Sequence, residues 1–381
     1  MAEDSGMKKK TSDFSFLDSG NSFDHPCVLY VKKAHYLLKK GKSVEFLPNK
    51  PEVSSIPNLK DQFGVTRIFY TSGSSGSPKQ VFHDQISIQN AIFGLRERIF
   101  DSPLNSVCCL PVNHVGGWMQ IERAISSGGK VFFCDYHDLM KVDLRSKLSN
   151  SWISLVPTQL YKLLNSHTAR QNLRTANGIF VGGSHLPEFL ASKARYNDIP
   201  LCPCYGMSET AGMITLLGPT DFLVGLNGVG EELNHASIRT LERDDQIVVR
   251  TKSLCLRLGD KILSRDDWLT TMDTGVRKEG VGWQIGTRLD RIINSGGEKV
   301  NPAKVENLVM ETGLVEKCFV FGMEDDQWGQ KVVIELVMKK QNLNRLKEIC
   351  RLKLKNYEFP KKWNLVKELP VSKMGKVRPK N

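Results

Sequence analysis

The chain has no apolar run approaching the length of a membrane-spanning helix, and residues 1–6 (MAEDSG) lack the features of a secretory signal peptide. Its nine cysteines form no CxxC pair, and neither Cys108–Cys109 nor Cys202 with Cys204 has the companion ligands of a zinc site. We therefore expect a cytoplasmic protein with reduced thiols and no membrane insertion.

The chain also lacks the signature of a nucleic-acid-binding protein. Its formal net charge of +12 suits a polyanionic partner. However, the lysines and arginines are scattered, and no arginine–aromatic platform accompanies the densest runs at residues 8–10, 39–40 and 353–380. We expect a site for phosphates and no nucleic-acid partner. The oligomeric state stays open, a homodimer included.

The first half of the chain alternates between strand-type and helical patterns. Short apolar runs of strand type recur at residues 107–110, 130–133, 152–156 and 178–181. Helical spacing appears between them, at residues 119–127 and 158–164. This alternation predicts an α/β core with a largely parallel sheet, whose ligand site lies at the carboxyl ends of the strands.

The pattern changes twice towards the carboxyl end. Residues 215–285 are typical of alternating β segments, for example at residues 246–250. Beyond Asp290 the pattern predicts a compact unit of helices and strands, with strands at residues 317–321 and 332–337. We predict two domains, 1–287 and 288–381.

The densest set of small and hydroxylated residues runs from Tyr70 to Lys79 (YTSGSSGSPK), after a strand expected at residues 66–70. Glycines let backbone N–H groups approach an anion, hydroxyls add donors, and Lys79 adds a positive charge. The segment is not a Walker loop, because Gln80 follows the lysine and the glycine spacing differs. It is typical of a polyphosphate-binding loop, and an ordinary Ser/Gly linker is the alternative.

Two further clusters have chemistry suited to a nucleotide. In residues 204–210 (CYGMSET), Tyr205 can stack on a base and Glu209 can hold Mg²⁺ that bridges phosphate oxygens. This cluster could open a helix, and the alternative is an ordinary turn capped by Ser208. In residues 272–275 (MDTG), Asp273 can accept both ribose hydroxyls, and a surface turn explains these residues equally well.

Taken in order, these segments resemble the adenylate-forming superfamily, which includes acyl-CoA synthetases, adenylation domains of peptide synthetases and beetle luciferases. The resemblance extends from about residue 66 to the end. The matching motifs are the phosphate loop at 70–79, the YGxTE-type motif at 205–210, the hinge region at 287–290, 295–298 and 302–306, and the terminal LPxxxxGK motif at 369–376. It implies a large N-terminal domain with mainly parallel sheets and a small mobile α+β C-terminal domain.

The resemblance also implies that ATP activates a small-molecule carboxylic acid. Lys376 would act between the substrate carboxylate and the α-phosphate, where a positioned cation lowers the barrier. Glu209 would bind Mg²⁺ and act as a second catalytic residue as pyrophosphate leaves. The residues implied to bind ATP are Thr71, Ser72, Gly73, Ser74, Ser75, Lys79, Gly182, Gly183, Ser184, Tyr205, Gly206, Thr210, Asp273 and Arg288.

A second conformation is implied for the transfer to coenzyme A, the co-substrate. The C-terminal domain would rotate about a hinge at Asp290, withdrawing Lys376. The residues then implied to line a tunnel for the thiol are Ser295, Gly296, Gly297 and Glu298. The alternative is that Lys376 is one of several tail lysines. Its flanking Gly375 and the upstream Leu369-Pro370 distinguish it from the others.

Residues 110–123 (LPVNHVGGWMQIER) are similar to a segment of the 2-succinylbenzoate–CoA ligases of quinone biosynthesis, where a histidine precedes an arginine by nine positions. His114 and Arg123 keep this interval. The resemblance implies that His114 is a catalytic and substrate-binding residue and that Arg123 pairs with the second substrate carboxylate, which is costly to bury alone. From the residues alone, His114 packing at a strand end and Arg123 as a solvated helix residue remain alternatives.

Residues 154–160 (SLVPTQL) strengthen the likeness to the cyanobacterial and plastid type of this ligase, and the endpoint, menaquinone or phylloquinone, stays open. Several positions depart from the family pattern: Ser74 and Ser75 replace threonines, Gln80 and Thr287 replace glycines, Asn113 replaces an aromatic residue, and Arg378 comes one position early. The region ahead of the phosphate loop is shorter than in typical members. Another aryl- or acyl-CoA ligase, an enzyme that loads a carrier protein, and a basic nucleic-acid-binding protein are the rival functions.

Overall fold

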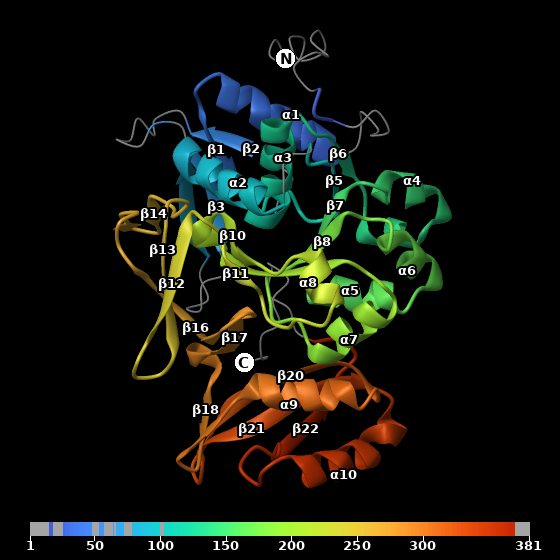
Figure 1. Ribbon diagram of the computed structural model, residues 1–381. Coiled ribbons are helices and arrows are strands. Elements are labelled where there is room, and N and C mark those ends of the chain that lie inside the picture. Colours follow the sequence, from blue (N-terminus) through green and yellow to red (C-terminus); the bar gives the residue numbers. More distant parts are fainter. Residues whose placement is uncertain are drawn as a thin grey trace.

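The computed structural model describes residues 15–17, 26–47, 53–56, 64, 66–71, 78–99 and 103–369. Within these ranges the chain builds three sheets in its larger, upper part and a fourth in a smaller lower part (Figure 1). All nine cysteines lie in described segments and are free thiols, as expected. No helix in these ranges is both long and apolar enough to cross a membrane.

A seven-stranded sheet forms the centre of the larger part, in the order β11-β10-β9-β8-β7-β5-β6. Its strands are β5 (Ser106–Cys108), β6 (Val131–Phe133), β7 (Trp152–Leu155), β8 (Gly178–Val181), β9 (Leu201–Met207), β10 (Gly212–Leu216) and β11 (Glu231–Glu232). The first five are parallel, and β10 and β11 add to the edge in antiparallel fashion. The predicted parallel α/β core is confirmed, with the predicted strands in place.

Helices connect the parallel strands, as the alternating pattern predicts. They are α3 (Val115–Ser127), α4 (Arg145–Leu148), α5 (Pro157–Leu164), α6 (His167–Leu173), α7 (Glu188–Tyr196) and, after β10, α8 (Pro219–Leu223). Helix α3 begins four residues before the predicted start, because His114 adopts an extended N-cap conformation directly after the β5 loop. The strand order reverses at β5, whose neighbours are β6 and β7, so a crevice is expected at the carboxyl ends of these strands.

The second sheet is not mainly parallel, so the expectation of mainly parallel sheets is wrong for this part of the large domain. Its order is β15-β14-β4-β3-β1-β2, with β1 (Ser43–Phe46), β2 (Val53–Ile56), β3 (Thr66–Thr71), β4 (Lys79–Asp84), β14 (Arg257–Leu258) and β15 (Lys261–Ile262). Only β1 and β3 run parallel. Strands β3 and β4 form a hairpin, which forces antiparallel pairing. Helices α1 (Pro26–Lys39) and α2 (Gln85–Ile99) accompany this sheet.

The third sheet is antiparallel throughout and accounts for the β character expected from residue 215 to 285. Its strands, in spatial order, are β12 (Ala236–Leu241), β13 (Gln246–Thr251), β16 (Leu269–Lys278) and β17 (Gly282–Arg288). Tyr205, Ile247 and Trp283 belong to the apolar cluster between this sheet and β9. This packing brings the end of β9 close to β16 and β17.

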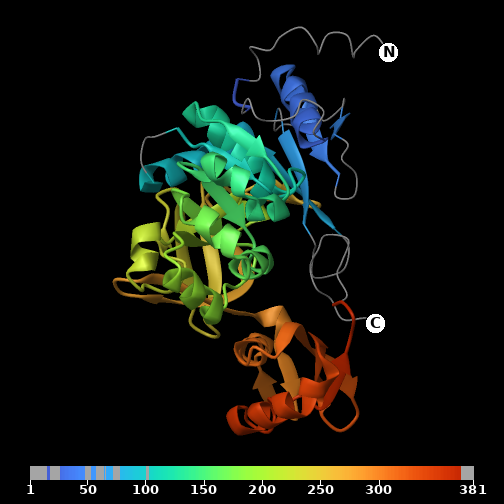
Figure 2. The same cartoon turned by 90° about the vertical axis from the view of Figure 1, so that its right-hand side faces the viewer.

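The lower part is an α+β unit, as expected for the C-terminal region (Figures 1 and 2). It contains β18 (Ile293–Ser295), β19 (Glu298–Val300), α9 (Pro302–Glu311), β20 (Val315–Asp325), β21 (Gly329–Met338), α10 (Leu343–Lys353) and β22 (Lys362–Leu365). Its core is a separate cluster that includes Val305, Val320 and Ile334. The unit therefore has an interior of its own, which a domain that moves as a rigid body requires.

Candidate functional site

The carboxyl ends of the central strands bring the predicted segments to one edge of the sheet. His114 follows β5, Gly182 to Ser184 follow β8, and Tyr205 and Gly206 lie near the end of β9. In an open α/β sheet this edge is where ligands bind. Segments that are far apart in the sequence are therefore placed for a common site.

A chain of hydrogen bonds joins four of the predicted residues. Tyr205 donates its hydroxyl to Asp273 Oδ2 at 2.8 Å, and Arg288 Nη1 donates to Asp273 Oδ1 at 3.3 Å. Arg288 also forms a bidentate pair with Asp290, at 3.0 and 2.8 Å. Asp273 and Arg288 are direct register partners on β16 and β17, which explains why they meet. Burial and the Asp273 carboxylate raise the pKa of Tyr205, so its hydroxyl stays protonated and remains a donor.

Asp273 retains the capacity to bind a further ligand. Each oxygen of an ionised carboxylate has two lone pairs, and the contacts above use one on each oxygen. The side chain is 14% exposed, so it is held in place but not sealed off. This geometry suits a residue that accepts two adjacent hydroxyl groups, as the ribose prediction requires.

The phosphate loop is held by a regular hairpin at its two ends. Thr71 closes β3, Lys79 opens β4, and the two are register partners. The predicted loop residues Ser72, Gly73, Ser74 and Ser75, like Lys376, lie outside the described residues. The side chain of Lys79 is exposed.

A cluster of polar side chains joins the base of this hairpin to the neighbouring strand. Tyr70 and Gln80 both donate to Glu45 Oε1, and Gln80 Nε2 also lies 2.9 Å from the Tyr70 hydroxyl. Ser54 donates to the other oxygen of Glu45. Gln80 stands where the family has glycine, and here its amide fastens both hairpin strands to β1. This departure from the pattern therefore adds contacts at the base of the loop.

Glu209 lies in a short 3-10 turn, Ser208–Thr210, and not at the start of a helix. The carbonyls of all three residues are anchored. Ser208 O accepts from His83 Nε2, Glu209 O accepts from Cys255 N at 2.8 Å, and Thr210 O accepts from Ser253 Oγ at 2.9 Å. The Glu209 side chain is half-buried on this turn. One carboxylate on a fixed backbone is a ligand that suits Mg²⁺ held chiefly by nucleotide phosphates.

Thr210 and Gly206 shape this segment. The Thr210 side chain is fully buried, and its hydroxyl donates to Gly212 O at 2.7 Å and accepts from Met207 N. A Cβ on Gly206 would lie 2.0 Å from Gly212 O, so the close approach of β9 and β10 requires glycine there. In this conformation both residues set the shape of the turn.

Gly182, Gly183 and Ser184, which the resemblance implies bind ATP, lie directly after β8. Gly183 has a φ of +80°, which favours glycine. A Cβ on Gly182 would lie 3.0 Å from Cys204 Sγ, so the segment passes close to β9. Ser184 is exposed.

His114 and Arg123 are carried by the same helix, at a distance from each other. His114 is the N-cap of α3, and its carbonyl accepts from Trp118 N at 2.9 Å. Arg123 is nine residues further, which corresponds to about 13 Å along the axis and about two and a half turns. A ligand that contacts both must therefore extend along the helix.

Arg123 is buried without a counter-ion among the described residues. It is 5% exposed, its Nε has no hydrogen-bond partner there, and its guanidinium lies 5.5 Å from the Phe180 ring centroid. Burial lowers the pKa of Arg123 to about 10, which still leaves it charged at neutral pH. The nearby Cys204 thiol does not neutralise it, because burial raises the pKa of Cys204 to about 12. The alternative of a solvated helix residue is wrong.

The acidic residue next to Arg123 is already paired. Glu122 Oε1 accepts from Arg67 Nε at 2.6 Å and from Trp118 Nε1 at 2.8 Å. Both side chains of the Arg67–Glu122 pair are less than a tenth exposed. The pair satisfies Glu122, so Arg123 is left as an excess buried positive charge. Such a charge is costly unless an anion joins it.

The predicted tunnel residues form a tight hairpin in the C-terminal unit. Ser295 and Glu298 are register partners at the ends of β18 and β19. Gly296 and Gly297 between them have φ values of +61° and +83°, which is the two-residue turn that requires positive φ at both positions. Gly296 N donates to Trp328 O at 2.9 Å, and a Cβ on Gly296 would lie 2.8 Å from the Trp328 ring. The hairpin is thus backed by Trp328.

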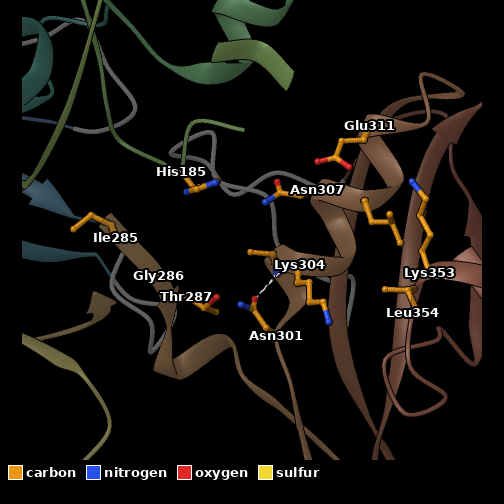
Figure 3. Close-up of a pocket in the computed structure, with 12 residues that line it drawn as sticks. His185, Ile285, Gly286, Thr287, Asn301, Lys304, Asn307, Glu311, Lys353 and Leu354 are labelled. Carbon is orange, nitrogen blue, oxygen red and sulfur yellow. Dashed lines mark hydrogen bonds between the residues drawn. The ribbon is translucent and has the colours of Figure 1, made fainter. Parts of the chain in front are cut away.

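A cavity of about 410 Å³ lies between the C-terminal unit and the larger part (Figure 3). It is lined by His185, Ile285, Gly286, Thr287, Asn301, Ala303, Lys304, Asn307, Leu308, Glu311, Lys353 and Leu354. None of the predicted site residues that the structure describes is among them. Its lining residues His185 and Thr287 are the sequence neighbours of Ser184 and Arg288.

Sequence reasoning missed three residues that support the site: Glu45, Arg67 and His83. Each is a polar or charged residue next to a buried apolar residue on a short strand, and Arg67 and His83 are at most 5% exposed. A charged residue within a buried strand pattern is the signal that could have drawn attention to them. Their partners lie far away in the sequence and could not have been named.

Comparisons with known proteins agree with this arrangement. The model of the AMP-binding enzyme family matches residues 28–252, and the model of the AMP-binding enzyme C-terminal domain matches residues 304–376. The chain belongs to the AMP-binding enzyme family. The resemblance identified from the sequence motifs is therefore confirmed.

Relatives and solved structures extend this result. The chain is 30% identical over 341 residues to 2-succinylbenzoate–CoA ligase of Listeria monocytogenes, covering 84% of this chain and 71% of the relative. It is 27% identical over 380 residues to indoleacetate–CoA ligase of Aromatoleum aromaticum, covering 94% and 72%. The fold is similar to that of o-succinylbenzoate CoA synthetase of Bacillus subtilis in complex with the acyl-adenylate intermediate OSB-AMP, with a TM-score of 0.72 at 23% identity, covering 82% and 67%.

Proposed function

We propose that the chain is a cytoplasmic, ATP-dependent acid–thiol ligase that converts 2-succinylbenzoate to 2-succinylbenzoyl-CoA and releases AMP and pyrophosphate. The product would enter the biosynthesis of menaquinone or phylloquinone. The observation that carries the substrate is Arg123, a buried cation without a counter-ion among the described residues. A substrate with two carboxylates presents one to the chemistry and one to such a cation. Relatives with this activity support the assignment.

In the first half-reaction, an oxygen of the substrate carboxylate attacks the α-phosphorus of ATP. The new P–O bond forms as the bond from the α-phosphorus to the bridging oxygen breaks, and pyrophosphate leaves. Asp273 and Arg288 would hold the ribose through the network that Tyr205 completes. Lys79 would bind the phosphates, and Lys376, by its motif, would place a positive charge between carboxylate and phosphate.

Mg²⁺ would be held by Glu209 together with the phosphates, and it would supply positive charge that stabilises the departing pyrophosphate. The chain would contribute a fixed backbone position for the residue that carries this carboxylate. Because three donors fix the Ser208–Thr210 backbone, the turn does not have to be ordered when the nucleotide binds. Such preorganisation lowers the cost of binding.

In the second half-reaction, the thiol of coenzyme A loses its proton to solvent and the resulting thiolate attacks the acyl carbon. A C–S bond forms, the bond to the AMP oxygen breaks, and AMP leaves. We propose that domain 288–381 rotates about Asp290, so that the Ser295–Glu298 hairpin reaches the site. The Arg288–Asp290 pair at the junction would have to rearrange in this step.

A second candidate is an aryl-CoA ligase for an acid with a single carboxylate, which the likeness to indoleacetate–CoA ligase favours. It would share the ATP chemistry and differ in the need for Arg123. A neutral aromatic group in the pocket would leave this cation without a partner.

The half-reactions can be tested separately with the variant Lys376→Ala. Acid-dependent pyrophosphate release should be lost, whereas synthetic acyl-adenylate plus coenzyme A should still give the thioester at a similar rate. An equal loss in both half-reactions would remove Lys376 from the adenylation step. Acyl-adenylate formation by the parent without transfer to free coenzyme A would instead indicate a carrier-protein acceptor.

A further inference from the structure

His83 connects two segments of the site that are 125 residues apart. It lies on β4, which Lys79 opens, and its side chain is fully buried. Its Nε2 lies 2.7 Å from the carbonyl oxygen of Ser208, the residue before Glu209. The strand that follows the phosphate loop is thus joined directly to the turn that carries the candidate Mg²⁺ ligand.

The partners fix which ring nitrogen donates. A carbonyl oxygen only accepts, so His83 Nε2 carries the proton in the bond to Ser208. Nδ1 lies 3.0 Å from Ser87 Oγ on α2 and can accept from this hydroxyl, whose single proton is shared with Asp84 O, also at 3.0 Å. The imidazole is therefore held on both sides, by the first helix after β4 and by the Glu209 turn. Its orientation is defined without any ligand.

The other anchors of the turn lie on a segment that reaches the same hairpin through its backbone, because Leu256 N donates to Phe82 O at 2.9 Å and β14 pairs with β4. Cys255 and Ser253, which hold the carbonyls of Glu209 and Thr210, belong to the segment between β13 and β14. Within the turn, Ala211 N approaches Ser208 O only at 3.3 Å. Among the described residues, His83 is the side chain of this hairpin that bonds directly to the backbone of the turn.

We infer that His83 is a positioning residue that fixes the Glu209 turn relative to the phosphate-binding hairpin and thereby sets the affinity for the Mg²⁺–nucleotide complex. The inference rests on the proposed function, because it assumes that Lys79 and Glu209 hold one Mg²⁺–ATP. The inference is based on the 2.7 Å distance between His83 Nε2 and Ser208 O. A side chain that only filled space in the core would not need a hydrogen-bond donor at this position.

Two near-isosteric variants separate the donor from the packing. The amide nitrogen of His83→Gln reaches about as far as imidazole Nε2 and can donate to Ser208 O. His83→Asn reaches only about as far as Nδ1, so it keeps the contact with Ser87 and loses the one with Ser208. A matched control is His235→Asn, because His235 is another buried imidazole, at 5% exposure, without a side-chain hydrogen bond in the described structure.

Binding of α,β-methylene-ATP, which cannot be cleaved between these phosphates, is measured by calorimetry on the full chain with and without Mg²⁺. We expect His83→Asn to weaken binding about tenfold in Mg²⁺ and to change Mg²⁺-free binding far less. His83→Gln and His235→Asn should stay within about threefold of the parent, and the KM of the acid should not change in any variant.

Parent-like Mg²⁺-dependent affinity in His83→Asn, or equal losses in the Asn and Gln variants, would overturn the inference. Should His83→Asn not fold, His83→Leu compared with His83→Gln makes the same test of the donor. A parent protein that binds no nucleotide at all would contradict the proposed function itself, and this inference with it. The two failures are therefore distinguishable.

Discussion

Asp273 and Arg288 face each other across β16 and β17, and Arg288 Nη1 donates to Asp273 Oδ1 at 3.3 Å. Tyr205 reaches the other carboxylate oxygen from the central sheet. Two residues from one sheet and one from another are thus joined around a single carboxylate. The network that we propose for ribose binding is thus formed by the chain's own residues.

Asp273→Asn tests this network. An amide offers one acceptor oxygen in place of two, so it cannot serve Tyr205, Arg288 and two ribose hydroxyls together. We expect the KM of ATP to rise by about tenfold or more while the KM of the acid changes little. Steady-state kinetics with each substrate varied in turn makes the comparison. A rise confined to the acid would contradict the ribose assignment.

Arg123→Met should have opposite effects on stability and on substrate binding. Removing an unpaired buried charge should raise the free energy of unfolding by about 1 kcal/mol or more. The same change should raise the KM of the dicarboxylic acid and leave that of ATP nearly unchanged. Urea denaturation and steady-state kinetics on one preparation measure both effects.

The matched control for Arg123→Met is Arg67→Met. It makes the same substitution at a buried arginine that does have a counter-ion, Glu122. It leaves Glu122 buried without its cation, so the free energy of unfolding should fall by about 3 kcal/mol or more. If both variants destabilise the protein equally, Arg123 has a partner of its own, and its charge cannot serve the substrate.

His235 predicts acid sensitivity of the fold. Burial lowers the pKa of His235 from 6.5 to about 4. The unfolded chain therefore binds more protons between these values, and stability is complete above pH 6.5 and falls as the pH decreases towards 4. The loss is on the order of 3 kcal/mol over this window. Denaturation curves of His235→Leu should show a smaller pH dependence there, and an unchanged slope would exclude His235 as a cause.

Gln80→Gly tests the cluster at the base of the phosphate loop. It restores the glycine of the family pattern but removes the amide that contacts Glu45 and Tyr70. Because the hairpin loses this link to β1, we expect the KM of ATP to rise a few-fold, by about 1 kcal/mol in binding. Glu45→Ala should have a similar or larger effect. Improved ATP binding in Gln80→Gly would mean that the glutamine obstructs the loop.

The parallel core was predictable because its signal is local. Runs such as 152–156 and 178–181 are continuous apolar stretches, which is what a strand covered on both faces requires. The second sheet was not predictable in this way. Its register is set by the β3–β4 hairpin and by β14, which joins β4 from far along the chain.

The candidate site was likewise predictable only in part. Short motifs contain Asp273, Glu209 and the glycine pairs at 182–183 and 296–297, so these residues could be identified from the sequence. Other features depend on how distant segments pack: the burial of Arg123, the pairing of Glu122 with Arg67 in place of Arg123, and the contact of His83 with Ser208. No pattern within the sequence records whether Arg67 or Arg123 pairs with Glu122. The three-dimensional structure shows that Glu122 pairs with Arg67. The buried Arg123 is left without this counter-ion, which is the physical reason for which we propose a dicarboxylate substrate.

The most direct test of the account is mass spectrometry of the parent protein incubated with Mg²⁺-ATP, coenzyme A and either 2-succinylbenzoate, benzoate or a medium-chain fatty acid. We predict AMP and a thioester with 2-succinylbenzoate, and no thioester with the two monocarboxylic acids. A thioester formed with benzoate or the fatty acid but not with 2-succinylbenzoate would contradict the assignment that rests on Arg123.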